Sequence, residues 1–382
     1  MQSIAQSWLV LQLTHSGFLL GVVMACQFTP MLIAGPFGGV VADRYPKRRV
    51  LLVTQSVFML PAFALFVLSF THLVQFWMVV IAAFALGAIN VFDVPSRQAF
   101  VIEMVGREDL MNAIALNSSV WNAAAVAGPA VAGLVIAAVG VPICFLANSV
   151  SYLGAVGALL LMRNLPVLVR DRVREPTLQS IRAGARYALH EPVVGMMLVA
   201  VAAFSLFAMN RLTLIPLFAD GVLHVGAAGF GFLMGFLGAG AMVGALTLAV
   251  VPGRFNSGRF QFWISMAWMA ALLSFSWSRW FPLSGLLLAA AGFCQMCFLA
   301  TANTRIQQTA PDELRGRVMA LYGQALMGVG PIGGLQAGIL AALFGAPAAM
   351  SVGAAVAGLV MLGIRVIRPA VFAAASARTT AF

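Results

Sequence analysis

Long runs of apolar residues alternate with short polar turns along almost the whole chain. A helix of about 20 residues, at a rise of 1.5 Å per residue, crosses the roughly 30 Å hydrocarbon core of a bilayer. The pattern therefore predicts an all-α protein that crosses the membrane many times. We expect its helices at 17–41, 49–70, 75–97, 112–138, 142–162, 192–219, 227–251, 259–278, 281–303, 316–343 and 346–367.

The first apolar stretch is shorter than the others. Only about thirteen residues precede the polar turn at Thr14, His15 and Ser16, and as a helix they would cover roughly 20 Å. The stretch lacks the basic start and small-residue cleavage site of a signal peptide. We therefore expect a truncated first helix, followed by about 11 complete ones, and a chain start that is misplaced or fragmentary.

A single long polar segment divides the expected helices into two sets of six. It extends from Arg163 to Glu191 and carries six arginines. We therefore expect two helix bundles joined by a basic linker. The expected domains are an N-terminal bundle at 1–162, a linker at 163–191, a C-terminal bundle at 192–367 and a tail at 368–382.

The two expected bundles share a pattern that repeats along the chain. Residues 94–133 and 302–338 each combine an arginine at a helix end, an acidic pair followed by leucine, and a Gly-Pro pair in the next helix. Shared helical geometry alone would not place these three features in one order. We therefore expect two homologous halves related by an axis along the membrane normal.

Composition and charge agree with a membrane protein. The chain is 62% hydrophobic and 9% charged, with a mean hydropathy of +0.98, whereas soluble domains carry roughly 25% charged residues. A net charge of +11 would suggest nucleic acid for a soluble protein, but here 20 of the 22 Lys and Arg residues fall in alternate loops or the tail, leaving only Arg211 and Arg279. The positive-inside rule places that face and both termini in the cytoplasm.

The densest charge lies in the turn between the second and third expected helices, in the segment GPFGGVVADRYPKRRVL at 35–51. Its spacing of glycine, aspartate and basic residues resembles the signature of the loop between helices 2 and 3 in the major facilitator superfamily of secondary transporters. The resemblance implies two six-helix bundles. The residues that carry it are Gly39, Asp43, Arg44, Lys47, Arg48 and Arg49.

In that superfamily the matching aspartate pairs with an arginine near the cytoplasmic end of helix 4 and faces the start of helix 11. The resemblance therefore implies that Asp43 pairs with Arg97 and faces Gly316, as a charged latch that closes the cytoplasmic side. An arginine fork would add paired hydrogen bonds to such a contact. The simpler alternative is that Asp43 is a solvated loop charge.

Three further segments resemble one branch of the superfamily, the transmembrane secretion effectors, which include macrolide-efflux and enterobactin-exporter-like proteins. They are FDVPSRQAF at 92–100, GREDL at 106–110 and NAIALNS at 112–118. The resemblance implies export of an amphipathic small molecule, a drug or a siderophore, from a bacterial cell by alternating access and proton antiport. Two departures are the short first helix and the absence from 252–259 of an aspartate to match Asp43.

Other functions remain open from the residues alone. An importer of the same fold would use the same helices. A non-transporting scaffold or sensor could have the same helix bundle. We expect an inner-membrane protein with protons, lipid and an amphipathic small molecule as partners, acting as a monomer without nucleic acid, cofactor or metal. No serine, histidine and acid set or paired intramembrane carboxylates point to an enzyme.

Asp93 is the one carboxylate that falls clearly inside an expected helix. A carboxylate in the membrane is costly and is a functional candidate by default. Its spacing of four residues from Arg97 puts both on one helical face, so a structural ion pair is the alternative to proton coupling through Asp93. Pro95 lies between them and removes one backbone donor.

Arg211 is the only basic residue deep in an apolar run, with eight residues still to follow before Asp220. Either its side chain snorkels to the membrane surface, or it faces a central cavity and meets an anionic or polar group of the substrate. Intramembrane amides are weaker candidates for the same cavity, because they often bond between helices. These amides are Asn210, Gln295 and Asn303.

Glycine-rich stretches at 229–235 and 238–244 superficially resemble phosphate-binding loops, but no strand precedes them, so we expect close helix packing. Gly128 and Pro129 resemble the helix 5 motif of antiporters of the superfamily, which implies a helix bend and packing there.

The residue types that bind metals are scattered. The cysteines all lie within apolar runs, and we expect them to act as small apolar side chains. The histidines of the expected outer loops are not spaced as ligands on one element. These residues are Cys26, Cys144, Cys294, Cys297, His15, His72 and His224.

Overall fold

The structure, a computed structural model, describes residues 1–105, 110–162, 177–250 and 257–372. The first part of the expected linker, the tail beyond residue 372 and the side chains of a few residues, Asp43 among them, lie outside the described part.

The first part of the chain forms six helices. Apolar runs supply their bodies, although α1, with 13 residues, is shorter than a membrane span. Polar turns supply their ends: the Ser16 hydroxyl, for example, accepts a hydrogen bond from the Leu19 amide at 3.4 Å and caps α2. The helices are α1 (Gln2–Thr14), α2 (Gly17–Arg44), α3 (Lys47–Phe70), α4 (Phe76–Val105), α5 (Leu110–Val139) and α6 (Val141–Leu161).

The second part begins with a short amphipathic helix and continues with further apolar ones. The segments are α7 (Thr177–His190), α8 (Pro192–Phe207), α9 (Arg211–Gly221), α10 (Gly226–Val250), α11 (Gly258–Trp277), α12 (Phe281–Thr309), α13 (Asp312–Gly323), the π-helical turn η1 (Gln324–Gly328), α14 (Gly330–Ile367) and the short turn η2 (Pro369–Phe372). All regular structure in the described ranges is helical. Eight apolar helical segments there are long enough to cross a membrane.

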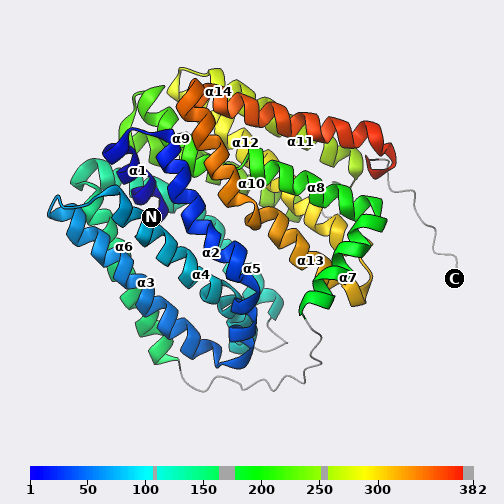
Figure 1. The fold of residues 1–382 in the computed structure, drawn as a ribbon, viewed down its shortest axis with the longest axis horizontal. Helices are drawn as coiled ribbons and strands as arrows, with labels where there is room; N and C mark the ends of the chain where they lie inside the picture. Colours follow the sequence, from blue (N-terminus) through cyan, green and yellow to red (C-terminus); the bar gives the residue numbers. More distant parts are fainter. Residues whose placement is uncertain (106–109, 163–176, 251–256, 373–382) are drawn as a thin grey trace.

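Figure 1 shows α2–α6 gathered on one side of the molecule and α7, α8, α11, α12 and α13 on the other, with α9 beside α1. We call the end of the bundle with the α2–α3 turn the basic face, since that turn holds Arg44, Lys47, Arg48 and Arg49. The other end, which holds the α3–α4 turn and the α11–α12 turn with Arg279, is the opposite face.

The expected single helix at 192–219 is wrong, because the chain breaks between α8 and α9. The Nδ2 of Asn210 donates to the Leu206 carbonyl at 2.9 Å. In a continuous helix the backbone amide of residue 210 would use that acceptor, so the side chain competes with the helical hydrogen bond. Arg211 consequently stands at the first position of α9 rather than in mid-helix.

The expected single helix at 316–343 is also interrupted, by η1 between α13 and α14. Pro331 has no amide to donate to the carbonyl four residues earlier, which weakens the ladder at this point. The Ser205 hydroxyl of α8 donates to the Leu326 carbonyl of η1 at 2.6 Å. The interruption in α13–α14 therefore packs beside the end of α8. Farther along, Gly345 (φ 83°) makes the sharp turn within α14 between the last two expected helices.

Reciprocal glycine contacts join one helix pair in each part of the chain. A Cβ placed on Gly38 of α2 would lie 1.8 Å from the Val91 carbonyl oxygen of α4, and one on Gly87 of α4 would lie 1.9 Å from the Gln27 carbonyl oxygen of α2. Such contacts bring the two backbones together.

The same arrangement recurs between α10 and α12. A Cβ on Gly240 would lie 1.8 Å from the Ala289 carbonyl oxygen, and one on Gly292 would lie 2.0 Å from the Leu237 carbonyl oxygen. The expectation that the glycine-rich stretch of α10 serves helix packing is confirmed. The recurrence also supports the expectation of two homologous halves.

The two groups of helices meet most closely near the opposite face. There Gly21 of α2 lies against Gly334 of α14, with a built Cβ only 2.6 Å from the Gly334 carbonyl oxygen, and Gly133 of α5 lies 2.6 Å from the Gly231 Cα of α10 by the same measure. Contacts of this kind bring the backbones of α2 and α14, and of α5 and α10, directly against each other at that end.

Two short segments cover the basic face of the second group. The Tyr187 hydroxyl of α7 donates to the Thr309 carbonyl at 3.0 Å, and burial followed by the charge of Glu191 raises the pKa of Tyr187, which keeps this donor protonated. The start of the expected tail forms η2, where Phe372 is buried against Phe262 of α11. Arg305 donates to the Val371 carbonyl at 2.6 Å and fixes the turn.

Candidate functional site

Three adjoining cavities lie between the two groups of helices. We name them by a residue that lines each: the Asp93 cavity of about 770 Å³, the Gln295 cavity of about 380 Å³ and the Asn210 cavity of about 220 Å³. Met296 lines the first two, and Met327 lines the first and third. Shared walls of this kind indicate one branched space, with the size expected of a small-molecule site.

Asp93 is buried and accepts four hydrogen bonds. The Thr54 hydroxyl and the Gln55 amide of α3 each donate to Oδ1 at 2.7 Å. Nε and Nη2 of Arg97 donate to Oδ2 at 3.1 and 3.0 Å. One cation and two neutral donors therefore satisfy the buried carboxylate, the kind of pairing that a buried charge requires.

Arg97 differs from Asp93 in its exposure. The side chain of Arg97 is 45% exposed, while that of Asp93 is 5% exposed, and both line the Asp93 cavity. Since one partner is open to the cavity and the other is not, an ion or a polar molecule in the cavity reaches the arginine first. The side chain of Asp43 lies outside the described part of the structure, so the expected pair of Asp43 with Arg97 stays a prediction.

Sequence analysis missed most of the polar lining of the Asp93 cavity. Gln2 is 8% exposed and its Nε2 has no partner among the described residues, although its Oε1 accepts from Asn148 at 2.6 Å. The Oε1 of Gln27 is likewise buried without a described partner. In the sequence, these glutamines could have been recognised as single polar residues within apolar runs. Other polar side chains on this lining are Ser3, Gln55, Asn90, Gln98 and Tyr152.

Arg211 lines both the Gln295 cavity and the Asn210 cavity. The break at Asn210 places it there, because the interrupted helix turns the first residue of α9 into the space between the two groups of helices. Within the described part of the chain its guanidinium makes no hydrogen bond or ion pair. Asp93, the acidic group of the neighbouring cavity, is already occupied by Arg97.

The other cavity candidates fall in different places. Asn210 lines the cavity named after it while bonding to Leu206, and Gln295 of α12 lines the cavity next to Arg211. Asn303 lies farther along α12 and accepts from Gln307. It lines none of the three cavities.

Gly128 and Pro129 lie within α5 and line the Gln295 cavity. A Cβ on Gly128 would meet no described atom within 4 Å, whereas the Pro129 carbonyl oxygen would lie 2.7 Å from a Cβ on Gly231. The carbonyl of Pro129, together with Gly133 one turn later, therefore sets the close crossing of α5 with α10.

The charged turn at the basic face contains one well-defined contact. Arg48 donates from Nε to the Leu159 carbonyl at 2.7 Å and from Nη2 to the Leu160 carbonyl at 3.0 Å. These carbonyls belong to the last turn of α6, where a cation is favourable. Arg44 is exposed, and Gly39 is half-buried with no described atom near a built Cβ.

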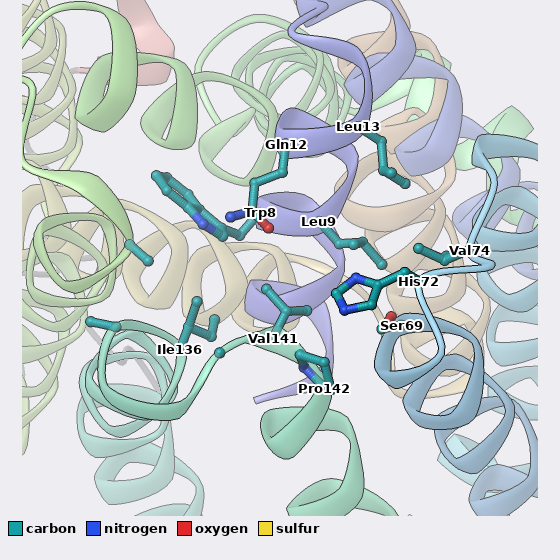
Figure 2. Close-up of a pocket in the computed structure, with 13 residues that line it drawn as sticks. Trp8, Leu9, Gln12, Leu13, Ser69, His72, Val74, Ile136, Val141 and Pro142 are labelled. Carbon is teal, nitrogen blue, oxygen red and sulfur yellow. The ribbon is translucent and has the colours of Figure 1, made fainter.

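A separate cavity of about 500 Å³ opens at the opposite face. Figure 2 shows Trp8, Gln12 and Leu13 along α1, with His72 and Ser69 from the α3–α4 region facing the same space. His72 has a left-handed backbone (φ 57°), as do His15 and His224 in the other turns of this face. Among the described residues no group of three or more metal-ligating side chains occurs, and all four cysteines are free.

The similarity to known proteins extends over almost the whole chain. The family model described as transmembrane secretion effector matches residues 1–380. The staphyloferrin A transporter of Staphylococcus aureus is 25% identical over 348 residues, which cover 90% of this chain and 85% of that protein. The multidrug efflux pump Tap of Mycolicibacterium fortuitum is 27% identical, with 88% of this chain and 84% of that protein covered.

A third relative, the enterobactin exporter EntS of Shigella boydii, is 26% identical, and the match covers 85% of this chain and 78% of that protein. Among solved structures, the nucleoside transporter NupG superposes with a TM-score of 0.76 at 11% identity, covering 96% of both chains. A POT family transporter in complex with 5-aminolevulinic acid gives a TM-score of 0.75 at 11% identity, covering 97% of this chain and 94% of that one. These likenesses show a shared fold, and the chain belongs to the transmembrane secretion effector family of the major facilitator superfamily, a family of transporters.

Proposed function

We propose that the protein is a secondary active exporter that moves an amphipathic small molecule, a drug or a siderophore, out of a bacterial cell in exchange for protons. The observation that carries this proposal is the branched cavity between the two groups of helices, with the buried Asp93 on one wall and Arg211 on the other. Three relatives support it: a staphyloferrin A transporter, a multidrug efflux pump and an enterobactin exporter.

Alternating access follows from where the helices touch. Close glycine contacts join the two groups near the opposite face, at Gly21 with Gly334 and at Gly133 with Gly231. We take these contacts as the closure of the cavity toward that face. In the proposed cycle the two bundles, 1–162 and 192–367, rock about the cavity and separate these contacts, so that the substrate leaves on the opposite side.

Asp93 is the proposed coupling residue. When its carboxylate takes a proton it loses its charge and can no longer hold the Arg97 fork through two charge-assisted bonds. The released guanidinium, already 45% exposed, then becomes available to the cavity. Since α3 supplies Thr54 and Gln55 while α4 supplies the carboxylate, the protonation state also bears on the packing of these two helices.

Orientation follows from charge. The α2–α3 turn gathers Arg44, Lys47, Arg48 and Arg49, whereas the opposite face has Arg279, so we propose that the basic face and both termini are cytoplasmic. Single cysteines at Arg279 and Gly316 in a cysteine-free background test this. A membrane-impermeant maleimide should label R279C in intact cells and G316C only after permeabilisation; the reverse result would overturn the orientation.

Transport itself is tested in cells that express the chain. Accumulation of ethidium, Nile red, dansylglycine and a catecholate siderophore is compared with that in cells lacking it, before and after a protonophore collapses the proton gradient. Lower accumulation of at least one probe that returns to the control level with the protonophore supports proton-driven export. Unchanged accumulation of all four, with the protein shown by immunoblot to be in the membrane, contradicts it.

A further inference from the structure

The charges that line the three cavities do not balance. Among the described residues their charged side chains are Asp93, Arg97 and Arg211. Asp93 and Arg97 neutralise each other through a fork with both distances near 3 Å. The described side chains of the cavity walls therefore carry one net positive charge, which belongs to Arg211.

The membrane makes this imbalance expensive. A guanidinium at the depth of an apolar bundle is unfavourable unless an anion or water compensates it. Within the described ranges no carboxylate contacts Arg211, and the acidic group on the shared space is fully engaged by Thr54, Gln55 and Arg97. Among the described residues this cation thus faces a cavity without a counter-ion, which is the arrangement of a site that receives an anion from outside.

The described groups next to Arg211 supply hydrogen-bond donors but no negative charge. Arg211 is the first residue of α9, and the first amides of a helix lack acceptors within that helix. The helix dipole has the same sign as the guanidinium at this end. Gln295 lines the same cavity and offers an amide.

The rest of the wall is apolar and adaptable. Apolar side chains from both groups of helices line the two cavities that Arg211 lines. Methionine fits irregular ligands because its side chain is unbranched and polarisable. The wall does not select one shape, but it does require an apolar body on the ligand. The apolar residues are Met24, Phe28, Met209, Leu212, Met234, Leu237, Met296, Leu299 and Met327.

We infer that Arg211 binds the anionic head group of the transported molecule, so that the substrates are amphipaths with one carboxylate or sulfonate on an apolar body rather than lipophilic cations. The inference rests on the proposed export function, since it takes the cavity as the substrate site. A guanidinium holds a planar carboxylate through two parallel hydrogen bonds. The Asp93 cavity next to it, with its uncharged glutamines, receives the polar remainder of a larger substrate.

Three probes with one fluorophore separate charge from shape: dansylglycine is an anion, dansylglycinamide is neutral and dansylcadaverine is a cation. Binding to the purified full chain in a nonionic detergent is followed by energy transfer from tryptophan to dansyl. The wild type is expected to bind dansylglycine about ten- to a hundredfold more tightly than the amide, the range for one charge-assisted contact. Equal affinities, or a preference for the cation, would overturn the inference without any variant.

Substitutions then locate the charge. Arg211→Gln should reduce the affinity for dansylglycine to that for the amide, while Arg211→Lys should retain most of the preference. Arg279→Gln, at the opposite face, is the matched control and should bind like the wild type. Unchanged dansylglycine binding by a monodisperse R211Q protein would remove Arg211 from the site.

The same probes distinguish failure of this inference from failure of the exporter proposal. Proton-dependent efflux of dansylcadaverine but not of dansylglycine would leave an exporter and overturn the anionic substrate class. Binding of dansylglycine that depends on Arg211, without efflux of any probe, would uphold the anion site and contradict export.

Discussion

Asp93 and Arg97 lie one turn apart on α4, and the guanidinium donates twice to one carboxylate oxygen while the other oxygen accepts from Thr54 and Gln55. The pair is thus both a structural contact within α4 and a link from α4 to α3. Because the carboxylate is buried and the arginine is partly open to the cavity, we propose that a proton on Asp93 would free the arginine to face the cavity. Spacing alone indicated the pair, and the structure adds the α3 donors.

Asp93→Asn is expected to abolish transport driven by a pH gradient while leaving substrate exchange without a gradient. The amide preserves an oxygen for Thr54 and Gln55 but cannot bind or release a proton. Purified protein is reconstituted into vesicles, and accumulation driven by a pH gradient is compared with counterflow. A loss of tenfold or more in the first assay alone is the expected result.

Thr54→Val is the matched control, since it removes one hydrogen bond to Asp93 and leaves the carboxylate in place. It should retain gradient-driven accumulation to within a few fold. If Asp93→Asn accumulates the probe as well as the wild type, the carboxylate serves structure only and another group carries the proton.

Arg48→Ala is expected to destabilise the protein by about 1–2 kcal/mol, because it leaves the Leu159 and Leu160 carbonyls at the end of α6 without their donors. Arg49→Ala removes the same charge from the next, exposed position and should change stability by less than about 0.5 kcal/mol. Urea unfolding in detergent, followed by tryptophan fluorescence, measures both. Equal effects of the two variants would show that net charge, rather than the α6 contact, matters.

Gly240→Ala is expected to be destabilising by about 1–3 kcal/mol, since its Cβ would lie 1.8 Å from the Ala289 carbonyl oxygen and force α10 from α12. Gly363→Ala is the counterpart in α14, where a Cβ meets no described atom within 4 Å. There the better helix propensity of alanine should be neutral or stabilise by about 0.5–1 kcal/mol. Thermal melting of both variants compares them, and a stable G240A protein would refute the close crossing.

The family and the positions of most helices could be predicted from the sequence, because a lipid-exposed helix must be apolar over a length set by the bilayer. The two interruptions could not. The run at 192–219 is long and mostly apolar, so its pattern predicts one helix. The helix ends where the Asn210 side chain bonds the Leu206 carbonyl, and this contact is not visible in the pattern. In the run that forms α13 and α14, the glycines and Pro331 indicated a weak point in the helix. The side chain that bonds to the interrupted turn, Ser205, comes from α8 and could not be predicted.

The candidate site shows the same limit. Spacing along one helix placed Asp93 beside Arg97, but contacts between helices are not visible in a single sequence. Thr54 and Gln55 therefore went unnoticed, as did Gln2 and Gln27. Arg48, one of the basic residues of the charged turn, bonds to the end of α6, a contact that its position in the sequence did not indicate. The side chain of Asp43 lies outside the described part, so its latch with Arg97 stays a prediction.

Reciprocal movement at the two faces is the most direct test of the account. Spin labels are attached in one protein sample at Tyr45 and Gly316, on the basic face, and in a second at Phe18 and Phe344, on the opposite face; all four residues are exposed. Distances are measured by pulsed electron paramagnetic resonance in lipid nanodiscs, in acidic and alkaline buffer, with and without dansylglycine. Alternating access predicts that one distance shortens as the other lengthens. Two distances that stay fixed under every condition, or that change in the same sense, would contradict it.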